Sequence, residues 1–225
     1  MKCLPPDGVL FDVGGGNGYV AREIQESGFE VVLVEPGLVG VQNAVKRGLR
    51  HVVRSTLQDA GVVPHTLPAI GLFDVIEHIR DDFEFLTMAK ALLIPGGRLY
   101  VTVPTYQSLW SREDILAGHA RRYNLRALKY LLQRVGFTVE FATYFFSFLP
   151  LPILFRRTLP YRLGLRSNVM SEAVIRPEAV VRSEHEVRAP ALRNVLRVLT
   201  RWELSKIAKQ QRVWLGASCL AVARS

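Results

Sequence analysis

Short apolar runs alternate with helical patterns along the first 146 residues. The apolar runs predict strands at residues 9–13, 30–34, 51–53, 69–76, 98–103 and 137–145, and helical patterns cover residues 18–27, 37–47, 81–93 and 125–135. Glycine follows several of the helical patterns, as it commonly does where a helix ends. Strands that alternate with helices predict an α/β fold: a Rossmann-like, doubly wound sheet that is mostly parallel, with helices on both faces.

A last apolar run, at residues 213–223, predicts a final strand of the same sheet. Its near-continuous apolar character suits a strand that is covered on both faces. The organisation predicted is a single domain with a core at residues 1–146, an insertion at 147–212 and the final strand within 213–225. An insertion of that length carries its own helices, and we expect it to act as a lid over the active site.

The second half of the insertion is a basic amphipathic helix. Residues 191–210 place Leu192, Val195, Leu199 and Trp202 on one stripe, and Arg193, Arg197 and Arg201 recur every four residues beside it. A helix of this kind binds an anionic membrane surface. Alternatively, it packs on the domain and exposes its charges to water.

Composition limits the class of protein. At 225 residues and 49% hydrophobic content, the chain suffices for one α/β domain. Cys3 and Cys219 lie at opposite ends without metal-ligand spacing, which favours a reducing compartment. Residues 1–8 lack the apolar region of a signal peptide, and no uncharged apolar stretch reaches the ~20 residues of a membrane span. These features predict a cytoplasmic protein, with peripheral membrane attachment left open.

The charge is distributed unevenly. Residues 1–146 hold 15 Lys/Arg and 15 Asp/Glu, whereas residues 147–225 hold 14 and 5, which accounts for the whole net charge of +9. A basic tail predicts an anionic partner, such as a phosphate group, a membrane surface or a nucleic acid. Residues 141–155 (FATYFFSFLPLPILF) carry no charge and precede Arg156. This run lines an apolar pocket, reaches a membrane interface or packs in the core, and beside a basic helix it favours a lipid-linked substrate over nucleic acid.

A glycine-rich turn follows the first predicted strand. The sequence VLFDVGGGNG at residues 9–18 places Asp12, Gly14, Gly16 and Gly18 at every second position. Glycine permits positive φ and lets a ligand approach the backbone, and the next helix directs its N-terminal amides to the same place. The dinucleotide pattern G-x-G-x-x-G fails because Tyr19 stands at its last position. The sequence therefore predicts a different ligand at the end of this strand.

Three motifs together resemble one family. The run from Asp12 to Gly18 resembles motif I of the class I S-adenosylmethionine-dependent methyltransferases. Residues 73–82 (FDVIEHIRDD) resemble a signature of a group that includes ubiquinone-type O-methyltransferases, and residues 93–104 (LIPGGRLYVTVP) are similar to the family's motif before strand five. Residues 118–123 (GHARRY) resemble bacterial methyltransferase-domain proteins. The resemblance implies S-adenosylmethionine as cofactor, S-adenosylhomocysteine as product, and a seventh strand antiparallel to strand five.

The same resemblance assigns the cofactor site. Glu35 lies 17 residues beyond Gly18, near the spacing at which an acid meets ribose hydroxyls in doubly wound folds. Residues 55–57, after the third strand, stand where family members contact adenine. The predicted cofactor-binding residues are Asp12, Gly14, Gly15, Gly16, Gly18, Glu35, Pro36, Ser55, Thr56, Leu57, Phe73 and Asp74.

Catalytic candidates lie beyond strands four and five. His78, His119 and Glu77 are the predicted catalytic residues, since a histidine that titrates near neutral pH can take the proton of a hydroxyl as the methyl group transfers. Beside His119, arginines can fork onto a carboxylate or phosphate. The predicted substrate-binding residues are Arg121, Arg122, Tyr123, Tyr106 and Trp110.

A divalent metal is a second, less favoured hypothesis. The run D-x-x-E-H formed by Asp74, Glu77 and His78, with His119, is similar to the E-x-x-E-H run with which small-RNA 2′-O-methyltransferases hold magnesium. Such an ion would acidify a substrate hydroxyl. Asp74 replaces a glutamate of that run and has a shorter reach. The alternative, which we favour, is that Asp74 caps the strand and Glu77 faces water. The principal prediction is therefore a site without metal.

The function predicted is O-methylation of a small, lipid-linked, isoprenoid or glycan substrate. No Asn/Asp-Pro-Pro-aromatic run follows strand four, and no cysteine lies near the predicted site, although N-methylation stays open. The alternatives are an RNA methyltransferase that uses the basic tail and a catalytically inactive, cofactor-binding interaction protein. The resemblance implies a helix before strand one that folds over the cofactor, whereas here strand one begins about eight residues into the chain. We therefore expect the insertion to cover the cofactor, the cofactor to be exposed, or the chain to start further upstream. The oligomeric state is not predicted.

Overall fold

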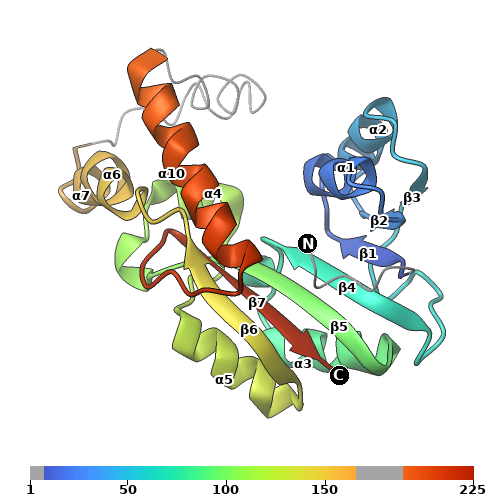
Figure 1. Cartoon of the computed structure of the whole chain (residues 1–225). Coiled ribbons are helices and arrows are strands. Elements are labelled where there is room, and N and C mark those ends of the chain that lie inside the picture. Colours follow the sequence, from blue (N-terminus) through green and yellow to red (C-terminus); the bar gives the residue numbers. More distant parts are fainter. Residues whose placement is uncertain (1–7, 166–189) are drawn as a thin grey trace.

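A seven-stranded sheet forms the centre of the molecule, in the order β3-β2-β1-β4-β5-β7-β6 (Figure 1). The computed structural model describes residues 8–165 and 190–225. The strands are β1 (Leu10–Val13), β2 (Val31–Val34), β3 (His51–Val53), β4 (Leu67–Phe73), β5 (Leu93–Pro104), β6 (Thr138–Phe145) and β7 (Ser218–Arg224).

The helices of the described chain follow the predicted alternation. They are α1 (Tyr19–Glu26), α2 (Leu38–Lys46), α3 (Asp82–Leu92), α4 (Arg112–Ala117), α5 (Leu125–Val135), α6 (Pro150–Ile153), α7 (Leu159–Arg162) and α10 (Pro190–Ala208), with short η1 (Ile76–His78), η2 (Gln107–Leu109) and the π-helical turn η3 (Leu154–Thr158). Helix α4 is not among the predicted elements. At six residues it is too short for an apolar period, and a capping box of Ser111 and Asp114 begins it.

Strands β1 to β5 pair in parallel, and β7 runs antiparallel between β5 and β6. The predicted fold and the antiparallel placement beside strand five are therefore confirmed. The final strand begins at Ser218 rather than at residue 213, because the chain before it crosses the strand ends. There the carbonyls of Val213 and Ala217 accept hydrogen bonds from the amides of Tyr144 and Thr105.

Two apolar layers cover the two faces of the sheet. On one face Phe85 and Leu86 of α3 and Leu128 and Leu132 of α5 pack with alternate residues of β4 and β5. A second cluster joins Ala21 and Ile24 of α1 to Ala44 of α2 and to the other side of the strands. Figure 1 shows α3 and α5 together on one side of the sheet. This alternation explains why strands buried on both faces read as continuous apolar runs.

The chain reverses its winding direction at β1, which pairs with β2 on one side and β4 on the other. In doubly wound sheets, ligands bind in the crevice beyond the carboxyl ends of the strands at this point. The predicted strand at 69–76 instead spans Leu67–Phe73, because Asp74 adopts φ 56° and turns the chain into η1. This early end brings Glu77 and His78 to the crevice edge.

The predicted insertion holds several helices in its described parts. Residues 141–145 belong to β6, and the apolar residues after them form α6 and η3. Helix α10 ends close to the predicted limit and rises beyond the sheet (Figure 1). Glu203 of α10 accepts hydrogen bonds from the amides of Phe146 and Ser147, which attaches the helix to the end of β6. In the described part of the chain, every helix is too short or too polar to cross a membrane.

Candidate active site

The glycine-rich turn leaves β1 through a series of left-handed residues. Gly14, Gly16 and Gly18 have φ of 70°, 53° and 75°, a region that residues with a Cβ rarely adopt. A Cβ at Gly16 would meet no atom within 4 Å, so the backbone borders open space there. The amide of Gly18 bonds to the Gly15 carbonyl, and α1 begins directly afterwards. The turn thus presents backbone amides and a helix N-terminus to a ligand.

Glu35 connects the end of β2 to this turn. Its Oε2 accepts the amide of Gly16 at 2.9 Å, and its Oε1 accepts the amide of Gly37 at 2.7 Å. The carboxylate is half-buried. A carboxylate has additional lone pairs beyond those two bonds, so it can also accept from vicinal hydroxyls. The geometry fits the predicted contact with a ribose.

Asp12 lies beneath the turn rather than on its surface. Its side chain is completely buried, neither oxygen has a hydrogen-bond partner, and a Cβ at Gly15 would meet Asp12 Oδ2 at 2.4 Å. Burial, and then the negative charge of Glu35, raise the pKa of Asp12 to about 7. Asp12 therefore lies directly beneath the glycine turn, and its contact with the cofactor stays a prediction.

The segment after β3 adds the next part of the edge. Thr56 Oγ1 donates to Asp59 Oδ2 at 2.6 Å, which forms a local turn, and Ser55 is half-buried beside it. Leu57 is buried in the main core cluster. Pro36 is exposed and Phe73 is half-buried at the ends of their strands. The prediction that residues 55–57 contact the adenine stays a prediction.

Asp74 holds the turn that follows β4. Its amide donates to the carbonyl of Thr102 on β5 at 3.0 Å, and Thr102 Oγ1 donates to Asp74 Oδ1 at 3.2 Å. A non-glycine residue at φ 56° stores backbone strain of about 1–3 kcal/mol, which such tertiary bonds hold in place. Surrounding protein raises the pKa of Asp74, and the Thr102 bond and the two nearby histidines oppose that effect. The residue as a whole remains exposed at the edge.

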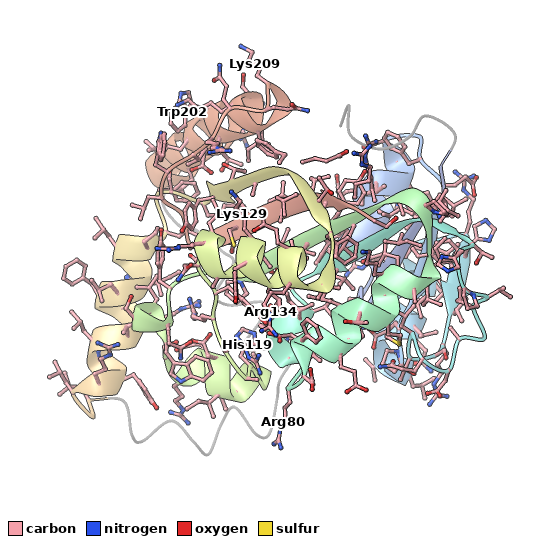
Figure 2. All side chains as sticks on the ribbon, turned by 90° about the horizontal axis from the view of Figure 1, so that it is seen from below. Arg80, His119, Lys129, Arg134, Trp202 and Lys209 are labelled. Atoms are coloured by element: carbon pink, nitrogen blue, oxygen red, sulfur yellow. The ribbon has the colours of Figure 1, made fainter. Side chains whose placement is uncertain are left out.

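Glu77, His78 and His119 converge at this edge. One potential ligand atom of each lies within 4.8 Å of the other two, and the two imidazole rings meet edge to face with centroids 4.7 Å apart. The loops join through the amide of Ala120, which donates to the Glu77 carbonyl at 2.7 Å. Figure 2 shows His119 among the side chains of this edge, with Arg80 projecting outward beyond it. The structure thus brings together all three predicted catalytic residues.

Asp114 orients His119. Its Oδ1 lies 2.9 Å from His119 Nδ1, and Arg122 forks onto both oxygens at 2.7 and 3.0 Å. These hydrogen bonds lower the pKa of Asp114 well below its usual range although burial opposes them. An ionised carboxylate only accepts hydrogen bonds, so Nδ1 of His119 carries the proton. The unprotonated nitrogen of the neutral ring is therefore Nε2.

No hydrogen bond satisfies the Glu77 carboxylate, although the positive charge of Arg122 opposes the rise of its pKa. Glu77 is completely buried and neither carboxylate oxygen makes a hydrogen bond. Burial, and then the charge of Asp74, raise the pKa of Glu77 to about 8. Burial and the adjacent His119 lower the pKa of His78, so this ring is neutral at pH 7 and able to accept a proton. The expectation that Glu77 faces water is wrong, because η1 turns it inward.

The cluster also fits a divalent cation. A buried carboxylate without partners is costly unless it is protonated or compensated by positive charge, and a metal supplies that charge. Two imidazoles and one carboxylate are common ligands for first-row transition metals. A metal-ligating histidine usually donates its other ring nitrogen to a carboxylate, as His119 does to Asp114. Asp74, a fourth predicted ligand, lies outside this three-residue group.

Arg121, Arg122 and Tyr123, which were predicted to bind the substrate, already have partners within the protein. Arg122 is almost fully buried against Asp114, and the Tyr123 hydroxyl donates to Asp82 at 2.6 Å. Arg121 also donates to Asp82, at 2.7 Å, although part of its side chain is exposed. Burial and the Asp82 bond raise the pKa of Tyr123. These contacts give Arg122 and Tyr123 a positioning role, and substrate binding stays a prediction that Arg121 is best placed to fulfil.

The remaining predicted substrate residues flank the ends of β5 and β6. Tyr106 adopts φ 58° and stacks on Tyr144, with ring centroids 5.6 Å apart. Burial and the neighbouring Tyr144 raise the pKa of Tyr106 to about 12, so its hydroxyl stays protonated. Trp110 is half-buried after η2. Both residues lie at the same edge of the sheet as the cluster, because the carboxyl ends of β4 and β5 are side by side.

The roles of two acidic residues at this site were not predicted from the sequence. Asp114 begins the short helix α4, and its spacing from Ser111 is a capping-box signal that predicts a helix start but not a role beside His119. Asp82 opens α3, and its bonds come from residues about 40 positions later. Only the fold brings such partners together.

A Rossmann-like sheet with this strand order, a glycine-rich turn after β1 and an acid after β2 define the class I S-adenosylmethionine-dependent methyltransferases. The chain belongs to the methyltransferase domain family, whose model matches residues 2–141. A probable S-adenosylmethionine-dependent methyltransferase of Mycolicibacterium smegmatis is 27% identical over 142 residues, covering 62% of this chain and 54% of that protein.

A second curated relative and a solved structure with the same fold are also similar to the chain. The ubiquinone biosynthesis O-methyltransferase of Caulobacter vibrioides is 31% identical over 103 residues, which is 41% of this chain and 39% of the relative. The crystal structure of a SAM-dependent methyltransferase from Archaeoglobus fulgidus superimposes with a TM-score of 0.60 at 17% identity, over 100% of this chain and 89% of that one. The chain spans about half or less of the length of these curated relatives.

Proposed function

We propose that this chain transfers the methyl group of S-adenosylmethionine to a hydroxyl oxygen of a substrate with an apolar portion. The observation that carries the proposal is the convergence of Glu77, His78 and His119 at the end of β4, the strand that pairs with β1 and its glycine-rich turn. The fold supports a nucleoside cofactor with its methionine portion near Gly14 and Gly16 and its ribose at Glu35. The sulfonium then lies at the carboxyl ends of β1 and β4, next to the histidines.

The reaction requires one methyl and one proton transfer. The substrate oxygen attacks the methyl carbon, the carbon–sulfur bond breaks, and S-adenosylhomocysteine leaves as a neutral thioether. The hydroxyl proton passes to a neutral imidazole, for which His78 is suited because its pKa is lowered. Positioning the two reactants in line supplies much of the acceleration, and the base contributes roughly 10²–10⁴-fold.

A metal-assisted form of the same reaction is favoured by the unpartnered Glu77 carboxylate. Glu77, His78 and His119 would hold the ion, and Asp114 would orient His119. A divalent cation supplies Lewis acidity that lowers the pKa of a bound hydroxyl. In this form His78 and His119 act as ligands, so the substrate proton leaves to solvent or to Asp74.

The apolar substrate portion is proposed from the chemistry of the surrounding chain. Tyr106 follows β5 and stacks on Tyr144 near the end of β6, and the apolar helix α6 follows β6. The name of the Caulobacter vibrioides relative describes O-methylation in ubiquinone biosynthesis, and a membrane-linked acceptor for this chain is consistent with that name.

The test is transfer of labelled methyl groups from S-adenosylmethionine into separate lipid, glycan and RNA fractions of bacterial cells. We expect label in the lipid fraction, and loss of roughly 10²-fold or more of the rate in His78→Asn. His51→Asn is the matched control, because His51 is an exposed histidine at the start of β3. Label only in RNA, or equal rates in both variants, would overturn the proposal.

A further inference from the structure

Helix α10 carries an apolar stripe that no described part of the domain covers. Val195, Val198 and Trp202 are 54%, 65% and 48% exposed. Their spacing of three and four residues places them on one side of an α-helix. A soluble helix normally turns such a stripe toward the core, so its exposure needs a separate explanation.

The attachment of α10 fixes which side points outward. Glu203 is buried, and its carboxylate accepts the amides of Phe146 and Ser147 at 2.8 and 2.7 Å. Residue 203 lies about 100° around the helix from Trp202, so the attached side and the stripe differ. Figure 2 shows Trp202 on α10, and Lys209 just after the helix, at the outer limit of the molecule. The apolar stripe therefore faces away from the sheet.

The exposed charged side chains that the structure describes in residues 147–165 and 195–225 are all positive. In the described residues 147–165 and 195–225, Glu203 is the one acidic side chain, and it is buried. Arg201 is exposed on α10, and Lys209 is exposed directly after the helix ends at Ala208. Lys206 Nζ lies 4.2 Å from the ring centroid of Trp202. Cations thus border the apolar side chains in the second half of the helix and directly after it.

The loop after α10 and the helices after β6 repeat this composition. Trp214 is 84% exposed and follows Arg212, while Leu151 and Phe155 are exposed next to Arg156. Tryptophan and arginine beside aliphatic side chains are characteristic of segments that lie at the boundary between lipid headgroups and acyl chains. The composition of α10 is therefore shared by the neighbouring described segments.

We propose that the outer side of α10 binds the surface of an anionic lipid bilayer. Val195, Val198 and Trp202 enter the headgroup boundary, and the lysines and arginines contact lipid phosphates. Phosphate-rich nucleic acid would match the cations but offers nothing to the two exposed valines, whereas a bilayer buries them. The proposal concerns membrane attachment and does not depend on which atom receives the methyl group.

Sedimentation of the full chain with phosphatidylcholine vesicles, with and without phosphatidylglycerol, tests the proposal. We expect the protein to pellet with the anionic vesicles and to be released by salt. Val198→Glu should weaken binding to the anionic vesicles about tenfold or more. It replaces an apolar side chain that enters the bilayer by a negative charge, which the anionic lipid repels. Val45→Glu is the matched control, because Val45 is a 57% exposed valine on α2.

Additional measurements distinguish a bilayer from RNA and from a second copy of the chain as the partner of α10. Equal melting temperatures and equal S-adenosylhomocysteine affinities for the two variants would show that Val198→Glu folds and retains its cofactor site. The proposal is overturned if the wild type stays in the supernatant with anionic vesicles, or if both variants pellet equally. It is also overturned if RNA binds with the same variant dependence in place of vesicles, or if light scattering shows a dimer that Val198→Glu dissociates.

Discussion

The carboxylate of Asp114 lies 2.9 Å from Nδ1 of His119, and the pair connects a short helix to the active edge of the sheet. Arg122 clamps the same carboxylate from the other side, and all three groups are mostly buried. The arrangement fixes the ring tautomer of His119 before any substrate arrives. It makes Asp114 a positioning residue that acts through His119.

Asp114→Asn should disturb both this tautomer and the fold. Loss of the charge leaves Arg122 buried without its partner, which costs roughly 3–5 kcal/mol of unfolding free energy. Methyl transfer should fall roughly 10- to 100-fold, as for other residues that orient a catalytic or metal-bound histidine. Nitrogen NMR of His119 should report the Nδ1-protonated form in the wild type and a mixture in the variant.

The acid stability of the protein provides a second readout of Asp114. Its pKa is lowered in the folded state, so the pair stabilises the fold above the ordinary aspartate pKa and this stability is lost as the pH falls below about 4. Asp114→Asn should therefore lose less stability than the wild type between pH 4 and pH 2. An unchanged NMR tautomer and an unchanged acid transition would contradict the role of Asp114.

Glu77→Gln should stabilise the metal-free protein at neutral and alkaline pH. The wild-type carboxyl ionises near 4.5 when unfolded and near 8 when folded. Between those values the unfolded chain binds fewer protons, so the unfolding free energy falls as the pH rises. The glutamine variant lacks this loss and should gain at least ~1 kcal/mol at pH 8 relative to pH 5.

Urea denaturation with a chelator present at both pH values measures the effect. Glu23→Gln serves as the control, because Glu23 is exposed on α1. The two variants should diverge only above pH 5. Parallel stability curves for Glu77→Gln and the wild type would show that Glu77 is not ionising in a buried site.

Gly16→Ala should weaken cofactor binding more than it weakens the fold. Gly16 and Gly61 have φ of 53° and 64°, and a Cβ on either would meet no atom within 4 Å. Both alanine variants therefore bear a similar backbone cost of roughly 1–2 kcal/mol. Only the Cβ of residue 16 enters the open space at the β1 turn, where we place the cofactor.

Calorimetric titration with S-adenosylhomocysteine separates the two glycines. We expect about tenfold or greater loss of affinity in Gly16→Ala and wild-type affinity in Gly61→Ala. Similar affinities in both variants would move the cofactor away from the β1 turn.

The metal-assisted form of the proposal predicts that added Mn²⁺ gives one bound ion that depends on Glu77 and His119. Binding should disappear in His119→Asn and Glu77→Gln and persist in His51→Asn. Since the folded pKa of Glu77 is about 8, binding at pH 7 should release a proton that appears as a buffer-dependent heat. Binding that survives both cluster substitutions would assign the ion to another place.

The sequence alone determined the order of strands and helices, the cofactor turn and the membership of the family. Those features are local: the apolar period, the glycines of residues 14–18 and the acid after β2 act within short stretches of chain. It also placed the two histidines on one edge, because the carboxyl ends of neighbouring parallel strands meet there. The antiparallel seventh strand followed from the resemblance and is confirmed.

Only the tertiary structure decided the environment of each side chain. Asp12 and Glu77 are buried without partners, and Arg122 and Tyr123 are bound to acids 8 and 41 residues away in sequence. The early end of β4 at the left-handed Asp74 turned Glu77 inward, against the expectation that it faces water. Burial and charge pairing depend on contacts between distant segments, and no local pattern encodes them. The same holds for the outward direction of the α10 stripe, which the bonds of Glu203 to the end of β6 determine.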